Sequence, residues 1–178
     1  MTGTPLGRSL VLAIHLSARG FGWAVFENPL SHVAAGVFTP TRCKDDRCIQ
    51  KIDRLLGRYQ PETVILEAFD PKRSRQQVRK QDLGHRLVSL VRGRAHDLAI
   101  LTHSEVQAAF ADVGARTREE IADAIHRSVP ALAYRLPKPR TPGDSERKAL
   151  PMFSAAALVF THYRNGATAL LDDLRDAA

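Results

Sequence analysis

Near its beginning, the chain carries a continuous run of apolar, β-favouring residues, Ser9–His15. A strand without polar alternation is buried on both faces, so it belongs inside a sheet that is covered on both sides. Turn signals at Arg19–Gly22 and at Asn28-Pro29 separate this run from two more β-rich runs, Trp23–Glu27 and Val33–Phe38. The short connections predict an antiparallel meander of three strands.

From Lys44 onward, the hydrophobic period changes from that of strands to that of helices. The pattern predicts, in order, a helix over 44–58, a strand at Thr63–Glu67, a helix over about 75–95, a strand at Leu98–Thr102, a helix over 104–110 and, after the capping box Thr117-x-x-Glu120, a helix to Arg127. The proline-rich stretch Pro130–Gly143 predicts a loop, which is followed by a last helix over 148–163 and a weakly helical tail. We therefore expect an α/β fold with a five-stranded mixed sheet flanked by helices. It should form a single domain over 1–178, with a core at about 9–163 and a tail at 164–178.

The composition is that of an ordinary globular protein, with 44% hydrophobic and 25% charged residues. The longest strongly apolar stretch, Met152–Phe160, is much shorter than the roughly 20 residues that cross a bilayer. Cys43 and Cys48 are five residues apart, a spacing typical of neither zinc nor redox motifs, and we expect both to be reduced. These features predict a cytoplasmic protein without a membrane partner.

The formal net charge of +7 is concentrated in one segment. Residues 72–94 hold eight basic residues against one acidic residue, Asp82, and the rest of the chain is balanced. At 100° per residue, Arg75, Arg79 and Arg86 lie within about 40° of one another on the predicted helix. A solvated helix face usually mixes charge signs, so this ridge favours a phosphate backbone as partner. The predicted binding residues in the segment are Lys72, Arg73, Arg75, Arg79, Lys80 and Arg86.

Four segments carry motifs that match a known pattern in order. They are Leu12–Val25, Val64–Glu67, Gly114–Ala122 and Met152–Leu158. Together they resemble the RuvC-type Holliday-junction resolvases, over about residues 9–163. The resemblance implies an RNase H-like fold, a DNA partner and a homodimer. It also implies phosphate-contacting roles for Arg116 and Arg118, which flank the capping Thr117.

The family uses a cluster of carboxylates to hold two divalent cations that hydrolyse phosphodiesters. In this chain the resemblance aligns His15 with the aspartate of the first strand and Ser154 with the aspartate of the last helix. Of the matched carboxylates, only Glu67 is present. One carboxylate does not balance two dications, which prefer anionic oxygen ligands. The resemblance therefore implies a nuclease centre that is degenerate and catalytically impaired.

Other residues could supply the missing ligands. Asp70 follows Glu67 closely, and Asp144 and Glu146 precede the last helix, where acids more often cap the helix. His15 together with Glu67 could hold a softer metal such as Mn²⁺ or Zn²⁺, although a lone histidine at a strand end is more often a structural hydrogen-bonding residue. We expect no cofactor unless the site is active, and Mg²⁺ or Mn²⁺ if it is.

Three functional hypotheses follow from the sequence. The first is a nucleic-acid-binding, RuvC-like protein that recognises DNA structure and backbone and has lost cleavage. The second is an active metal-dependent, structure-specific endonuclease that uses Glu67 with unusual ligands. The third is an assembly protein that binds an acidic protein partner through the basic segment. We favour the first, because the scaffold and the basic segment are retained beside a dismantled carboxylate cluster.

Overall fold

The computed structural model describes residues 9–42, 44–69, 75–135 and 149–176. Its centre is the predicted five-stranded mixed sheet, with strand order β3-β2-β1-β4-β5. The strands β1 (Val11–Leu16), β2 (Phe21–Asn28) and β3 (Ser31–Phe38) form the predicted antiparallel meander. The strands β4 (Thr63–Glu67) and β5 (Asp97–Leu101) continue the sheet parallel to β1. The predicted sheet is thus confirmed, with strand ends that differ by at most two residues from those expected.

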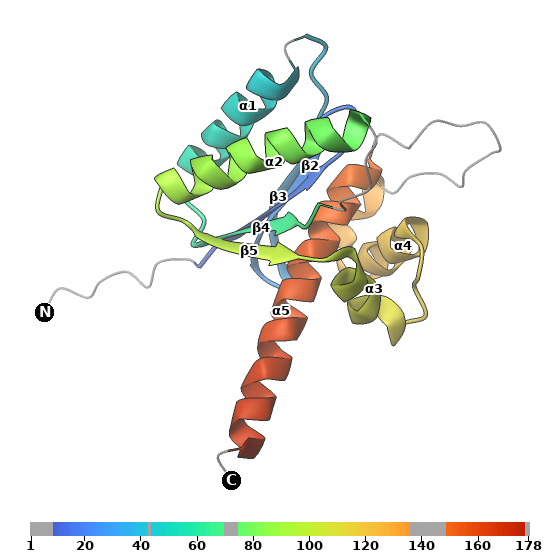
Figure 1. Ribbon diagram of the computed structural model, residues 1–178. Coiled ribbons are helices and arrows are strands. Elements are labelled where there is room, and N and C mark those ends of the chain that lie inside the picture. The colour runs from blue at the N-terminus through green and yellow to red at the C-terminus, as the bar shows by residue number, and fades with distance from the viewer. Residues whose placement is uncertain (1–8, 43, 70–74, 136–148, 177–178) are drawn as a thin grey trace, which may run out of the picture.

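Helices cover both faces of the sheet (Figure 1). One face packs against α1 (Lys44–Tyr59) and α2 (Arg75–Gly93). The other face packs against α5 (Leu150–Asp176), which is flanked by α3 (His103–Ala111) and α4 (Arg118–Ser128). The predicted capping box at Thr117 is present at the start of α4, where Thr117 and Glu120 satisfy each other's backbone N–H groups.

The central strand divides its side chains between two cores. All six residues of β1 are buried, as the unbroken apolar run predicts. Leu12, Ile14 and Leu16 pack toward α1 and α2, whereas Val11 and Ala13 pack toward α5. Since side chains alternate along a strand, His15 lies on the α5 face, in line with Val11 and Ala13.

A close approach between α5 and β2 fixes the geometry near His15. The strand register pairs His15 with Gly22. A Cβ atom at Gly22 would lie 2.0 Å from the carbonyl carbon and oxygen of Pro151, in the first turn of α5. Glycine is therefore required at this position, because any side chain would push α5 away from the sheet.

The last helix differs most from the prediction. We expected a helix ending at Tyr163 and a weakly helical tail, but α5 continues without interruption from Leu150 to Asp176. Gly166 is the poorest helix former in the extension, and its cost of about 1 kcal/mol does not end a helix that already has a buried half. The first residues of the predicted loop, Pro130–Arg135, form a short 3₁₀ helix. Among the described residues, no helix has the length and apolarity to cross a membrane.

Candidate functional site

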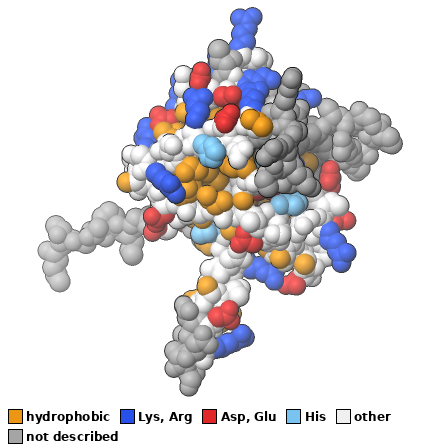
Figure 2. All heavy atoms as spheres, viewed as in Figure 1, with side chains coloured by type: hydrophobic (Ala, Val, Ile, Leu, Met, Phe, Trp, Pro, Cys, Tyr) orange, Lys and Arg blue, Asp and Glu red, His pale blue; other side chains and the backbone are white. Residues whose placement is uncertain are grey.

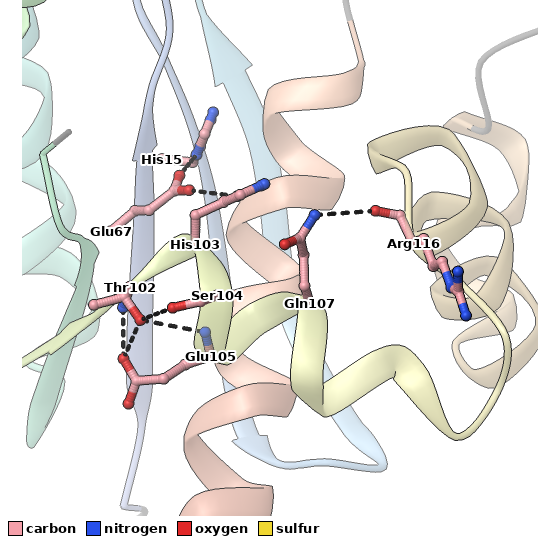
Figure 3. A network of polar contacts seen from close by, with 8 residues as sticks. All are labelled: His15, Glu67, Thr102, His103, Ser104, Glu105, Gln107 and Arg116. Atoms are coloured by element: carbon pink, nitrogen blue, oxygen red, sulfur yellow. Dashed lines mark hydrogen bonds and ion pairs between the residues drawn. The ribbon is translucent and has the colours of Figure 1, made fainter. Parts of the chain in front are cut away.

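Three titratable side chains meet at one edge of the sheet. His15 is the penultimate residue of β1, Glu67 is the last residue of β4, and His103 follows β5 by two positions. The strands β1, β4 and β5 are parallel neighbours, so their carboxyl ends lie at the same edge. Figure 3 shows the carboxylate of Glu67 between the two imidazole rings.

Both oxygens of the Glu67 carboxylate are occupied by histidines. Oε2 lies 2.6 Å from Nδ1 of His15, and Oε1 lies 3.2 Å from Nδ1 of His103. The His15 contact is a close approach of the two groups, since Nδ1 of His15 has no hydrogen-bond partner of good geometry among the described residues. The exposed fraction of the side chain is 4% for His15, 19% for Glu67 and 53% for His103. A largely buried carboxylate is thus held between one buried and one accessible imidazole.

The surroundings keep Glu67 ionised. Burial alone would raise the pKa of this carboxyl group. The contact with His15, together with the charges of His15, Arg118 and His103, outweighs burial and lowers the pKa of Glu67 to about 2. An ionised carboxylate can only accept hydrogen bonds, so Nδ1 of His103 donates to it. The Nε2 atom of His103 remains on the side of the ring away from Glu67.

A cavity of about 260 Å³ opens over this cluster. Besides His15, Glu67 and His103, its lining includes the cationic side chains Lys80 of α2 and Arg118 of α4. Phe69, which also lines the cavity, packs its ring on Gly84 of α2 so closely that a Cβ atom there would lie 2.0 Å away. This contact holds α2 against the end of β4 and brings Lys80 to the cavity.

Ser154 lies on the α5 side of the same cluster. It lines a small cavity of about 20 Å³ together with His15, Glu67, His103 and Arg118. This volume is about that of a single water molecule. The structure therefore brings together three positions that the sequence singled out, namely His15, Glu67 and Ser154.

Another cavity, of about 230 Å³, adjoins the 260 Å³ cavity over Glu67 and shares Lys80 with it. The turn after β1 contributes Arg19 to its lining, the start of α1 contributes Lys44, and α2 contributes Arg79. Asp45 is the one acidic residue in this lining among the described residues. Together, the cavities form a cleft along the carboxyl ends of the strands, and we call it the basic cleft. Its described cationic residues are Arg19, Lys44, Arg79, Lys80 and Arg118.

Two of the arginines predicted to form a ridge on α2, Arg79 and Arg86, contact α1. The guanidinium of Arg79 binds Asp45 through Nε and Nη2, with a shortest distance of 2.5 Å. Arg86 pairs with Asp46 at 2.7 Å. Further along the same helix pair, Arg94 contacts Asp53 at 2.6 Å. The charge of the basic segment is thus partly balanced by α1, which lowers the number of cations available to a phosphate backbone.

Other predicted site residues lie elsewhere. Arg116 is exposed, and Figure 3 shows its side chain pointing away from the Glu67 cluster, while its carbonyl oxygen accepts from Nε2 of Gln107 at 3.5 Å. Five predicted positions fall outside the described residues or their described side chains, so their roles stay predictions. They are Lys72, Arg73, Arg75, Asp144 and Glu146; Asp70 is likewise outside the described residues.

His103 was not identified from the sequence, although a signal for it exists. The pattern Thr102-x-x-Glu105 is a capping box, and the structure confirms both of its reciprocal hydrogen bonds. The box ends β5 and starts α3 at His103, which places this side chain at the edge of the sheet where His15 and Glu67 lie. Arg19 and Lys44 were also missed, because they join the cleft from a turn and from a helix start.

The described residues do not fit a pair of divalent cations. Hard cations require several oxygen ligands, whereas Glu67 is the one carboxylate that lines the cavity among the described residues. Its two oxygens already contact histidines, and Arg118 adds positive charge. Within the described part of the chain, no group of three His, Cys, Asp or Glu side chains is arranged to hold a metal ion.

Comparisons with known proteins show the fold. Neither a protein-family model nor a curated protein matches the chain. Thermus thermophilus RuvC in complex with a Holliday junction substrate superimposes with a TM-score of 0.64 at 17% sequence identity, covering 86% of this chain and 91% of that chain. A second structure of Thermus thermophilus RuvC gives a TM-score of 0.63 at 15% identity, covering 90% and 96%. The chain therefore has the predicted RNase H-like fold of the RuvC type.

Proposed function

We propose that the protein binds nucleic acid, with DNA as the favoured form, through the basic cleft, and that it does so without two-metal cleavage. The observation that carries this proposal is the makeup of the cavity over Glu67. In a RuvC-type fold this edge of the sheet is where the resemblance implies carboxylates. Among the residues that the structure describes, two histidines, Lys80 and Arg118 surround a single carboxylate here. Such a lining favours a bound phosphate over a bound cation.

Support for the cleft also comes from its continuity. Lys80 lies at the junction of the two cavities, with Arg118 on one side and Arg19 and Lys44 on the other. A row of cations along a continuous cleft can follow successive phosphates of one strand. The RuvC structure bound to a Holliday junction has the same fold, which is consistent with a DNA partner for this chain.

The test is a DNA-binding titration with matched variants. We expect Lys80→Ala and Arg118→Ala each to weaken binding of a four-way junction or duplex. Each should lower the salt dependence by about one unit for the lost phosphate contact. The control is Arg58→Ala, which removes an exposed arginine at the far end of α1, where it stacks on Tyr59. This control removes the same charge outside the cleft.

Two results would contradict the proposal. One is the absence of DNA binding at low salt, which would favour an acidic protein partner instead. The other is an equal loss of affinity for Arg58→Ala and Lys80→Ala, which would mean that overall charge and not the cleft determines binding. The preferred nucleic acid is identified by comparing affinities at one salt concentration. The ligands compared are a four-way junction, a duplex, single-stranded DNA and RNA of the same sequence.

A further inference from the structure

His103 presents a ring nitrogen that can accept a proton. Its Nδ1 donates to Oε1 of Glu67 at 3.2 Å, so in the neutral imidazole the other nitrogen, Nε2, carries the lone pair. Figure 3 shows the ring of His103 with this outer nitrogen directed away from Glu67. Histidine side chains are visible at the surface of the face drawn in Figure 2, and the side chain of His103 is 53% exposed. A ligand in the cavity that His103 lines can therefore reach Nε2.

The carboxylate of Glu67 holds this ring in one tautomer. Its other oxygen, Oε2, lies 2.6 Å from Nδ1 of the buried His15, so the carboxylate is fixed from both sides. A histidine that donates one N–H to a buried carboxylate and leaves its other nitrogen open has the arrangement of a general base. The pair of Glu67 and His103 is therefore suited to remove a proton from a bound ligand.

Two cations share the cavity with this base. Lys80 comes from α2 and Arg118 from α4, and both side chains line the space that His103 also lines. No carboxylate among the described residues pairs with Lys80. Cations beside a phosphate offset the negative charge that develops on its oxygens when a new bond to phosphorus forms. The cavity thus places a proton acceptor and two phosphate-binding side chains around one space.

The size of the catalytic effect limits which phosphodiester could react here. A positioned base contributes roughly 10²–10⁴-fold, which is a small part of what enzymes supply to hydrolyse the slowest phosphate esters. A DNA linkage has no nucleophile of its own. A ribonucleotide has one, because its 2′-hydroxyl lies next to the phosphate, and well-oriented intramolecular groups reach effective molarities of about 10⁵–10⁸ M. The cavity therefore suits the linkage on the 3′ side of a ribonucleotide.

We propose that the protein cleaves nucleic acid at a ribonucleotide, with His103 as the catalytic base and without a metal ion. The inference rests on the proposed function, because the strand that is cut is the one bound in the basic cleft. Nε2 of His103 takes the proton of the 2′-hydroxyl, and the 2′ oxygen forms a bond to phosphorus while the bond from phosphorus to the next 5′ oxygen breaks. The proton then passes from Nε2 to that 5′ oxygen, directly or through water. The products are a 2′,3′-cyclic phosphate and a 5′-hydroxyl, and His103 is regenerated.

The test uses two strands of one sequence in the presence of EDTA, namely a DNA strand that contains one ribonucleotide and an all-DNA strand. We expect the wild type to cleave only the first strand and to leave a 2′,3′-cyclic phosphate on the ribonucleotide. In single turnovers with saturating protein, His103→Ala should cleave at least about 100-fold more slowly. The control is His85→Ala, which removes an exposed histidine of α2 that lines neither cavity of the cleft and should leave the rate unchanged.

Added imidazole separates catalysis from a structural role of His103. It should restore part of the rate of His103→Ala, because it can occupy the space of the lost ring and accept the proton. Pyrazole has a ring of the same size but is a far weaker base, so it should not restore the rate. Circular dichroism checks that both variants are folded, and identical purification of all proteins reveals any contaminating nuclease.

Binding is measured separately, on the all-DNA strand. Binding without cleavage of the strand that contains the ribonucleotide would overturn this inference and leave the proposed function standing, whereas the absence of binding would contradict both. Cleavage that requires Mg²⁺ or Mn²⁺, or cleavage of the all-DNA strand in EDTA, would overturn the chemistry. Equal rates for His103→Ala and the wild type, or equal rescue by pyrazole and imidazole, would overturn the role of His103 as the base.

Discussion

The Nδ1 atom of His15 lies 2.6 Å from Oε2 of Glu67, and the contact is buried at the carboxyl ends of two neighbouring parallel strands. It places a buried imidazole directly against the one carboxylate that lines this cavity among the described residues. An imidazole can balance the charge of Glu67 from within the protein, whereas a second carboxylate would require a cation. This edge of the sheet therefore surrounds Glu67 with basic side chains, with Lys80 and Arg118 joining the two histidines in the lining of the cavity.

The His15–Glu67 contact should make stability depend on acid pH. The pKa of Glu67 falls from the ordinary 4.5 to about 2 in the folded protein, despite burial that would raise it, because of the His15 contact and the nearby positive charges. The unfolded chain therefore takes up this proton first as the pH falls. The stabilisation is full above about pH 5, is lost as the pH falls toward about 2, and has an upper limit on the order of 3 kcal/mol. In urea titrations, Glu67→Gln should have a lower free energy of unfolding than the wild type at pH 7. The difference between the two free energies should become smaller below pH 4.5.

A matched control separates this effect from general acid denaturation. Glu119→Gln removes a carboxylate of α4 outside the cluster and should leave the acid dependence close to that of the wild type. A gap between Glu67→Gln and the wild type that stays constant from pH 7 to pH 3 would show that Glu67 stabilises the fold by packing and not by its charge.

The local parts of the fold could be predicted from the sequence, because local patterns determine them. The apolar run of β1, the strand ending in Glu67 and the capping box at Thr117 each depend on a few neighbouring residues. The ion pairs that α1 makes with Arg79, Arg86 and Arg94 could not be predicted, since they join α1 to α2 and to the turn after α2, across a buried strand in the chain. The same is true of the Glu67–His103 contact, which depends on the order in which the strands pair.

The Arg79–Asp45 pair should limit nucleic-acid affinity. Asp45→Asn would release the guanidinium of Arg79 at the basic cleft, with a small effect on stability, because the pair is largely exposed. We expect about fivefold tighter binding and a salt dependence larger by about one unit, measured by fluorescence anisotropy.

Asp53→Asn is the matched control, because it makes the same charge change but releases Arg94. Arg94 lies roughly 22 Å from Arg79 along α2, well beyond the cleft. Equal gains for Asp45→Asn and Asp53→Asn would mean that net charge, and not the position of Arg79, determines affinity.

The contact between Gly22 and Pro151 should be sensitive to a single methyl group. Gly22→Ala would place a Cβ atom 2.0 Å from the backbone of Pro151 and should destabilise the protein by about 3 kcal/mol or more, since backbone must move. Gly57→Ala in α1, whose nearest neighbour is a side-chain atom 4.0 Å away, should be neutral or stabilising by up to about 1 kcal/mol. Thermal unfolding compares the two variants, and similar midpoints would contradict the close approach of α5.

Burial should make the thiol of Cys48 unreactive. Burial raises the pKa of Cys48 to about 11. The negative charge of Asp45 adds to this effect, and the positive charge of Arg79 opposes it. The reactive thiolate is therefore scarce at pH 8. In a Cys43→Ser background, a thiol reagent should modify Cys48 only after denaturant is added. Rapid modification of the folded variant would contradict this environment.

Adding carboxylates beside Glu67 should create a cation site. His15→Asp with Ser154→Asp would place two new carboxylates beside Glu67, because both positions line the small cavity that Glu67 also lines. Three close carboxylates repel one another, so the double variant should be less stable than the wild type without a metal ion and should gain stability when Mn²⁺ or Mg²⁺ binds. We expect Mn²⁺ to raise the unfolding temperature of the double variant and to leave that of the wild type unchanged.

The wild type should not cleave junction or flap DNA with either cation. Cleavage by the wild type that Glu67→Gln abolishes would instead show an active nuclease.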